Sequence, residues 1–279
     1  MSQKKQEVQE AQANALPAGL DFGADVGAGM EGADKDSFAI PFLRALQKIS
    51  PEVDEADAKF IEGAKGGQLF NSVTQKLYDG KTGVIFIPCA YQRRFLRWAP
   101  RGSEGGYKGE YRPEEVAAMR ERGEVVQIEG EGLFIADEDG NANAKKNDRL
   151  ADTRSHFGLT YDPETGETQQ VLLALSSTQI KKSKQLMSML NNVKVKNASG
   201  SMVTPPTWVN QIRLTTVLES NSEGSWYGLK VEGEGFIPNQ DVYEKGKAFH
   251  EAVAAGEAKA NFAEEETAGE AKGEGEGKF

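Results

Sequence analysis

The sequence predicts a mainly β fold with α additions, namely an OB-fold-like barrel with an inserted helix, a C-terminal helix and disordered tails. Three observations support this class. Between residues 69 and 237, short apolar or alternating runs are separated by turn residues such as Asp79-Gly80. One segment with helical spacing interrupts these runs, and a second follows them. Several short strands with one inserted helix fit a small five-stranded barrel.

The expected strands follow one another along the middle of the chain. Before them, residues 41–49 have near-helical spacing and are expected to form a short helix or turn, which Ser50-Pro51 closes. A further helix is expected over 114–122, in a Gly-rich, charged region of weak periodicity. The expected strands are 69–73, 83–88, 91–98, 157–161, 170–175, 207–218 and 225–237. The last four pair into two hairpins, whose turns are rich in Gly, Asn, Asp and Ser.

Two longer helices are expected. The inserted helix has capping residues at 176–178 and runs to about Asn192. The C-terminal helix covers residues 241–255 and ends at Gly256, a residue type that favours helix termination.

The net charge of −10 is concentrated at the two ends of the chain. Residues 1–37 hold seven acidic and three basic residues, and residues 251–279 hold eight and three. Both ends have too few apolar residues to offset the entropy of ordering. We therefore expect a disordered segment over 1–37, one OB-like domain over 38–256 and an acidic disordered tail over 257–279.

The compartment follows from cysteine usage and hydropathy. Cys89 is the only cysteine, so no intramolecular disulfide can form. The polar start has no apolar stretch typical of a secretory signal, and no apolar run approaches the ~18 residues that a membrane span needs. These features predict a protein of a reducing cytoplasm that does not bind membranes.

Sequence motifs for catalysis and for metal binding are absent. His156 and His250 are the only histidines and lie far apart in the sequence, so no zinc site of ordinary ligand spacing is expected. There is no phosphate-binding glycine loop and no nucleophile elbow. The sequence therefore predicts no metal, no cofactor and no enzymatic activity.

Two stretches contain no carboxylate, residues 80–103 and residues 168–218. A polyanion disfavours carboxylates that face it and favours cations, and unpaired bases stack on aromatic rings. Buried strands also exclude charge, but this alternative does not explain the Lys181–Lys184 cluster. The candidate nucleic-acid-binding residues are Tyr91, Arg93, Arg94, Phe95, Arg97, Trp98, Arg101, Lys181, Lys182, Lys184, Lys194, Lys196 and Arg213.

Strand geometry limits which of these candidates can act together. In an extended chain, the odd-numbered residues of 91–97 share one face, and the even-numbered residues of 94–98 share the other. One of these faces is expected to pack inward, so only some of the side chains can contact a ligand. Trp208 and Trp226 are expected to belong to the core rather than to serve as stacking platforms.

The end of the sequence is an acidic stretch, residues 263–279, whose last residue is Phe279. An apolar ring and a terminal carboxylate on one residue suit a partner pocket with a basic rim. Glu274, Glu276 and Phe279 are therefore the candidate partner-binding residues. The acidic stretch can also lie in a basic groove as a mimic of DNA until DNA displaces it. The alternative is a tail that only increases solubility.

A set of short motifs runs through residues 38–255. They include Pro41-Phe42-Leu43, Ile87-Pro88-Cys89, Ser177-Thr178-Gln179, Leu214-Thr215-Thr216 and Ser225-Trp226-Tyr227. This set resembles a widespread group of tailed-bacteriophage proteins, often described as single-stranded DNA-binding, and the tail resembles the tip of bacterial and phage single-stranded DNA-binding proteins. The resemblance implies an OB-type core that coats displaced strands in the cytoplasm of the infected bacterial host. It also implies tail contacts to phage or host replication and recombination proteins.

We therefore expect a non-catalytic single-stranded DNA-binding protein that acts in phage DNA replication, recombination and repair. Homo-oligomer formation stays open. Three alternatives also remain open: a single-strand annealing recombination protein, a virion or assembly protein with no nucleic-acid role, and an RNA-binding protein.

Overall fold

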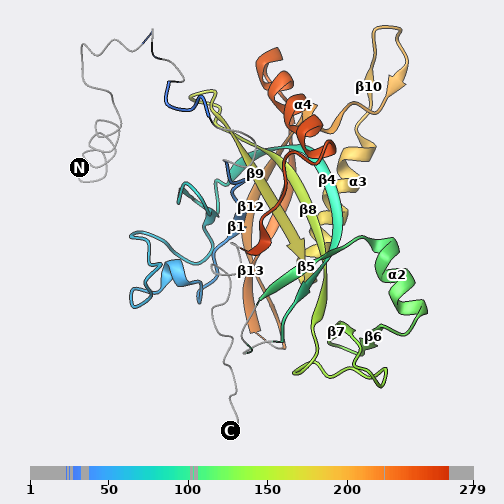
Figure 1. Ribbon diagram of the computed structural model, residues 1–279. Helices are drawn as coiled ribbons and strands as arrows, with labels where there is room; N and C mark the ends of the chain where they lie inside the picture. The colour runs from blue at the N-terminus through green and yellow to red at the C-terminus, as the bar shows by residue number, and fades with distance from the viewer. Residues whose placement is uncertain are drawn as a thin grey trace. The chain divides into compact units, whose positions relative to one another are not determined.

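The computed structural model describes residues 23, 25, 28–32, 38–100, 103, 106–222 and 224–263. The chain separates into two units, Met1–Phe38 and Ala39–Phe279. In the first unit, the amide of Gly29 donates hydrogen bonds to the carboxylate of Glu31. All helices and strands given below belong to the second unit (Figure 1).

The second unit is mainly β, as predicted, since strands account for 39% and helices for 21% of the residues that the structure describes. The α-helices within the described residues are α2 (Pro113–Glu121), α3 (Ile180–Asn192) and α4 (Gln240–Ala254). The strands are β1 (Leu43–Ala45), β2 (Leu69–Asn71), β3 (Leu77–Tyr78), β4 (Val84–Trp98), β5 (Tyr107–Tyr111), β6 (Val125–Ile128), β7 (Gly132–Ile135), β8 (Arg149–Tyr161), β9 (Thr168–Ser176), β10 (Val195–Lys196), β11 (Met202–Val203), β12 (Asn210–Asn221) and β13 (Gly224–Phe236). Short 3-10 turns are η2 (Pro51–Val53), η3 (Ser177–Gln179) and η4 (Thr207–Val209). The inserted helix, the C-terminal helix and the helix near residue 114 are all present.

Five strands form the centre of the main sheet in the order β9-β8-β4-β12-β13, and neighbours are antiparallel. Along the chain this is the order third, second, first, fourth and fifth, with α3 between the third and fourth. An OB barrel has the same order and brings its third and fifth strands together. Here β9 and β13 do not pair. The predicted class is confirmed, whereas strand pairing does not close the barrel.

The segment around β1 ties β9 to β13 across this opening. Phe42 forms a parallel bridge with Leu172 of β9, and the Leu172 amide donates to the Pro41 carbonyl at 2.8 Å. On the other side, Gln47 Nε2 donates to the Tyr227 carbonyl at 2.9 Å. The Tyr227 amide in turn donates to Gln47 Oε1 at 2.7 Å.

This arrangement corrects the prediction for residues 41–49. Instead of a helix, the segment begins with the strand β1, which pairs with β2 in a separate sheet of order β1-β2-β3. Phe42 and Leu43 are buried in different apolar clusters on opposite sides of the segment. An extended chain sends adjacent side chains in opposite directions, and a helix does not. The predicted turn follows at Lys48-Ile49.

Side-chain amides form hydrogen bonds with backbone groups in the middle of the edge strand β13. Besides the two Gln47 bonds at Tyr227, the Leu229 amide donates to Gln179 Oε1 at 3.1 Å. Gln185 Nε2 donates to the Val231 carbonyl at 3.4 Å. These glutamines satisfy backbone groups that a neighbouring strand would otherwise satisfy.

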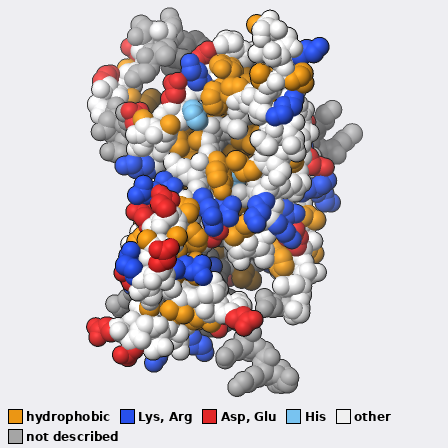
Figure 2. All heavy atoms as spheres, turned by 90° about the vertical axis from the view of Figure 1, so that its right-hand side faces the viewer, with side chains coloured by type: hydrophobic (Ala, Val, Ile, Leu, Met, Phe, Trp, Pro, Cys, Tyr) orange, Lys and Arg blue, Asp and Glu red, His pale blue; other side chains and the backbone are white. Residues whose placement is uncertain are grey.

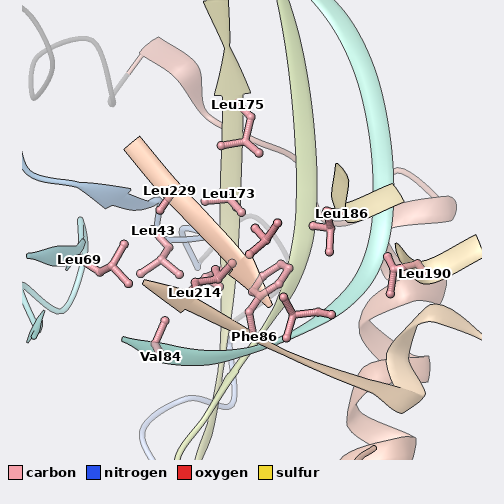
Figure 3. Packing of buried hydrophobic residues seen from close by; sticks show 13 residues of the cluster. Leu43, Leu69, Val84, Phe86, Leu173, Leu175, Leu186, Leu190, Leu214 and Leu229 are labelled. Carbon is pink, nitrogen blue, oxygen red and sulfur yellow. The ribbon is translucent and has the colours of Figure 1, made fainter. Parts of the chain in front are cut away.

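The barrel interior is one apolar cluster between the sheet and α3 (Figure 3). Phe86, Leu186 and Leu214 in this cluster are 0% exposed. Gly158 of β8 lies against Phe86, and a Cβ at that position would be 2.4 Å from the phenyl ring. Because α3 contributes Leu186 and Leu190 to the cluster, core packing fixes the position of the helix.

The opposite face of the same strands is covered by α4. Ile87 of β4, Phe157 of β8 and Leu172 of β9 pack there with Phe249 of α4. The rings of Phe157 and Phe249 meet edge to face, with centroids 6.3 Å apart. Phe262, after α4, belongs to the same cluster and is 4% exposed. The strands β4, β8 and β9 are therefore buried on both faces within the barrel.

Strands β4 and β8 continue beyond the barrel and pair as far as Trp98 and Arg149 (Figure 1). Whereas β12 pairs with the first residues of β4, β5 pairs with the last. The insertion formed by β5, α2, β6 and β7 has a small core of its own around Phe95 and Val116. Strand β8 begins eight residues earlier than predicted. The prediction missed residues 149–156 because they mix charged, polar and small side chains and contain no apolar run.

Candidate nucleic-acid interface

The second half of β4 alternates as the sequence predicts. The residues opposite each other are Tyr91 and His156, Arg93 and Arg154, Phe95 and Asp152, and Arg97 and Leu150. Directly opposite residues of two paired strands share a face. We term the face that carries these eight residues the arginine face.

Asp152 holds two arginines of the arginine face. Its carboxylate accepts hydrogen bonds from Nε and Nη2 of Arg93 at 3.0 and 2.8 Å. It also accepts from Nε and Nη2 of Arg154 at 2.9 and 3.1 Å. Arg154 donates from Nη1 to the Tyr91 hydroxyl at 3.2 Å. Burial opposes ionisation of Asp152, but the two arginines outweigh it and hold the pKa of Asp152 below its ordinary value.

Asp148, next to the start of β8, repeats this pattern. Its carboxylate accepts from Arg97 Nε at 2.6 Å and from Lys108 Nζ at 2.8 Å. Arg97 also donates to the Tyr111 hydroxyl at 3.3 Å. Burial again opposes ionisation, and the two cations outweigh it, so the pKa of Asp148 is lowered. The side chains of Arg97 and Lys108 remain 32% and 42% exposed, which leaves N–H groups available to a ligand.

Helix α3 contacts the arginine face through a buried polar pair. His156 Nε2 lies 2.8 Å from Ser183 Oγ, and the two residues are 1% and 0% exposed. Burial, and to a smaller extent the charge of Arg154, lowers the pKa of His156 to about 4. The imidazole is therefore neutral at neutral pH. The next residue of α3, Lys184, is exposed and has no ion-pair partner among the residues that the structure describes.

Glu219 of β12 holds two further lysines of α3. Its Oε1 lies 3.1 Å from Lys182 Nζ and 3.6 Å from Lys181 Nζ. Its Oε2 accepts a hydrogen bond from Trp226 Nε1 at 3.1 Å. Burial opposes ionisation of Glu219, but the lysines outweigh it and lower its pKa. A Cβ at position 228 would lie 2.6 Å from this carboxylate, so Gly228 leaves the room that Glu219 occupies.

Each of these three carboxylates is therefore matched by two cations. The six cations are Arg93, Arg154, Arg97, Lys108, Lys181 and Lys182. Figure 2 views the second unit from the side of α2 and α3, and it shows Lys and Arg side chains in a band beside exposed hydrophobic side chains. Each guanidinium carries five N–H donors in a planar fork, which suits phosphate oxygens. This arrangement can bind several phosphate groups.

Three predicted residues of β4 add no exposed group to the arginine face. Arg94 points to the opposite face, where its Nε is 3.4 Å from Glu110 Oε1. Trp98 also lies on that face and packs against Tyr107, with ring centroids 5.6 Å apart. Phe95 is on the arginine face, but it is 7% exposed and belongs to the core of the insertion.

The remaining predicted cations lie on other elements. Arg213 of β12 forms two hydrogen bonds to Glu234, at 2.8 and 2.6 Å, and donates to the Thr82 carbonyl at 2.9 Å. Lys194 and Lys196 are exposed on and next to β10, in the separate β10-β11 hairpin. The structure therefore does not link these three residues to the arginine face. Arg101, Glu274, Glu276 and Phe279 lie outside the described residues.

The stretches without acidic residues do not produce a surface without carboxylates. The carboxylates that pair with the predicted cations come from elsewhere in the chain: Glu110, Asp148, Asp152, Glu219 and Glu234. Pairing in a sheet brings residues that are distant in sequence face to face. The cations of these stretches therefore face carboxylates that other parts of the chain supply.

Two cations of the site, Arg154 and Lys108, were missed because acidic residues surround them in the sequence. The signal that could have found Arg154 is the alternation Asp152, Arg154, His156, which places a charged or polar residue at every second position of a strand. A search for stretches of one charge sign passes over such an alternation.

One comparison with known proteins identifies the family. The model of a family described as Pam3 phage gp34-like protein matches residues 8–259. The chain belongs to this family. It is therefore a bacteriophage protein, as the resemblance implied. No curated protein and no solved structure matches the chain.

Further properties of this phage protein come from the part of the chain that the structure describes. There, no helix is both long enough and apolar enough to span a bilayer. Nor do its His, Cys, Asp and Glu residues form a group of three or more that could hold a metal ion. The thiol of Cys89 is buried, and burial raises its pKa to about 12.

Proposed function

We propose that this phage protein binds single-stranded DNA without catalysis, through the arginine face and helix α3. The observation that carries the proposal is the ratio of two cations to each carboxylate on these elements. The six cations and three carboxylates leave three net positive charges, and Lys184 adds a fourth. Cations that neutralise phosphates supply attraction that does not depend on sequence.

The carboxylates are compatible with this role because they orient the cations. Asp152 holds the guanidinium groups of Arg93 and Arg154 in place, so less side-chain entropy is lost when a phosphate binds. The Arg93 side chain is still 38% exposed. If the three carboxylates stay paired, the net charge of four, Lys184 included, predicts a log–log salt slope of about −3. If phosphates replace them at all seven cations, the slope is about −5.

Base stacking supports a single strand rather than a duplex as the proposed ligand. Bases of a single strand can stack on aromatic rings and guanidinium planes. Each stacked base contributes roughly 1–3 kcal/mol to the binding free energy. Tyr91 and the arginine planes offer such surfaces on the arginine face. The strand order is that of OB folds, which bind oligonucleotides in many proteins. This analogy supports the proposal at the level of the fold alone.

In the infected cell, such a protein would coat displaced strands during phage replication, recombination and repair in the host cytoplasm. The acidic tail, with Glu274, Glu276 and Phe279, would recruit phage or host replication and recombination proteins. This part of the proposal rests on the sequence of the tail and on the resemblance stated above.

A fluorescence-anisotropy titration tests the proposal. Labelled single-stranded DNA, duplex DNA and single-stranded RNA of equal length are titrated with protein over a tenfold range of salt. We expect the single-stranded DNA to bind most tightly, with a slope between the two values above. The double variant Arg93→Gln, Lys184→Gln should weaken binding of every sequence alike and make the slope shallower by about 1.4. Arg122→Gln, which removes an exposed arginine paired with Glu124, is the matched control and should bind as the wild type does.

The same assay separates the alternatives. Faster pairing of complementary strands in the presence of protein would favour an annealing protein. Tighter binding of RNA would favour an RNA-binding protein. No binding of any oligonucleotide at low salt would refute the proposal and favour a virion or assembly role.

A further inference from the structure

The hairpin formed by β12 and β13 lines an apolar pocket together with residues 47–49. The pocket has a volume of about 270 Å³. Its apolar lining consists of Ile49, Leu218, Trp226 and Tyr227, and Lys48 also lines it. Ile49 and Leu218 are 61% and 53% exposed, so the pocket has an apolar rim at the surface. Its volume is below the ~300–1,000 Å³ typical of drug-sized ligands, so it suits a single ring system.

The two aromatic residues of the pocket are held in place. The Trp226 indole donates to Glu219, and the backbone of Tyr227 is bonded on both sides to Gln47. The Tyr227 ring lies against Gly67, where a Cβ would be 2.7 Å from the ring. Gly67 has a φ of +94°, a region that favours glycine. A ring that enters the pocket therefore meets aromatic surfaces that lose little entropy on binding.

Glu219 links this pocket to two cations. One of its oxygens accepts the Trp226 indole N–H, and the other lies near Lys182 and Lys181. A single carboxylate thus places a partly exposed indole beside two ammonium groups, and Lys48 adds a third cation at the pocket itself. A planar apolar ring joined to an anion is complementary to this combination.

We infer that this pocket binds one base of a single-stranded DNA, while the adjoining phosphates lie on Lys48, Lys181 and Lys182. The inference rests on the proposed function and extends the DNA path from the arginine face across α3 to the hairpin. It also changes the role of Trp226, which the sequence analysis assigned to the core. Because Tyr227 already occupies the Gln47 amide, the Ser225 hydroxyl and Lys48 are the side-chain polar groups left for a base, and the pocket should accept all four bases.

Binding of labelled oligo(dT) to the full chain tests the inference, with Trp226→Ala as the main variant. Loss of one stacking surface should weaken binding about 5- to 150-fold. The salt slope should stay unchanged, because the indole carries no charge. Trp226→Phe keeps a ring and should retain most of the affinity. An oligo(dT) with one abasic position should bind the wild type less tightly but lose little further in Trp226→Ala.

A second pair of variants controls for unfolding of the Trp226→Ala protein. Leu218→Ser changes the pocket lining, whereas Val217→Ser changes an exposed neighbour on the same hairpin that does not line the pocket. We expect weaker binding from the first only. If the wild type binds oligo(dT) but Trp226→Ala and Leu218→Ser bind equally well, the pocket inference is overturned and the proposed function stands. If the wild type does not bind at all, both are overturned.

Discussion

Replacing Asp152 by asparagine tests how the carboxylates and the arginines work together. Asp152 accepts four hydrogen bonds from two guanidinium groups, and asparagine has one acceptor oxygen and no charge. Arg93 and Arg154 then have one net charge more to offer a phosphate. The log–log salt slope for single-stranded DNA should become steeper by about 0.7. The ratio of mutant to wild-type affinity should therefore fall about fivefold for each tenfold rise in salt.

The same substitution should lower stability, because the two arginines lose a charged partner in a partly buried site. A loss of about 1–3 kcal/mol in the free energy of unfolding is expected, measured by chemical denaturation. The matched control is Glu124→Gln, which changes the protein's charge equally but lies beside Arg122 on the exposed surface. DNA binding is compared by anisotropy at several salt concentrations. Equal salt slopes for the two variants would refute the reasoning, since Asp152 would then not compete with phosphate.

Three further predictions concern the folded core. The pKa of His156 is about 4, below the ordinary value of 6.5, so between these pH values the unfolded chain binds the extra proton. The contribution of neutral His156 to the free energy of unfolding should therefore be complete above pH 6.5 and decrease by up to about 3 kcal/mol toward pH 4. His156→Gln should remove most of this decrease in denaturation curves. Gly158→Ala brings a Cβ to 2.4 Å from the ring of Phe86, and it should lower stability by about 1–3 kcal/mol; an unchanged melting temperature would show that the strands can shift apart. The buried thiol of Cys89 should not react with a thiol reagent until denaturant is added, and rapid reaction of the native protein would contradict its burial.

The sequence predicted the strands and helices in which buried residues recur at a regular spacing. The alternation in β12 and β13 and the apolar stripe of α3 come from burial against one core, and such periods are visible locally. The first half of β8 and the strand β1 escaped prediction for a different reason. Residues 149–156 mix charged, polar and small side chains without an apolar run, and residues 42–43 are buried on opposite sides by partners distant in sequence.

The candidate site was only partly predictable for the same physical reason. That Arg93 and Arg97 share a face follows from strand geometry alone. Their partners Asp152 and Asp148 are set by the register between β4 and β8, which no local pattern reports. The lysines of α3 were found because they cluster in the sequence, whereas Glu219 comes from a strand that follows the helix.

The amides of Gln47, Gln179 and Gln185 along β13 have a consequence for self-association. A second molecule cannot add a strand at Tyr227, Leu229 or Val231 unless it first breaks these bonds. This part of the β13 edge is therefore protected from pairing with a strand of another copy, which the proposed coating of DNA would bring close. Cooperative filaments of this protein would have to be built from contacts between other surfaces.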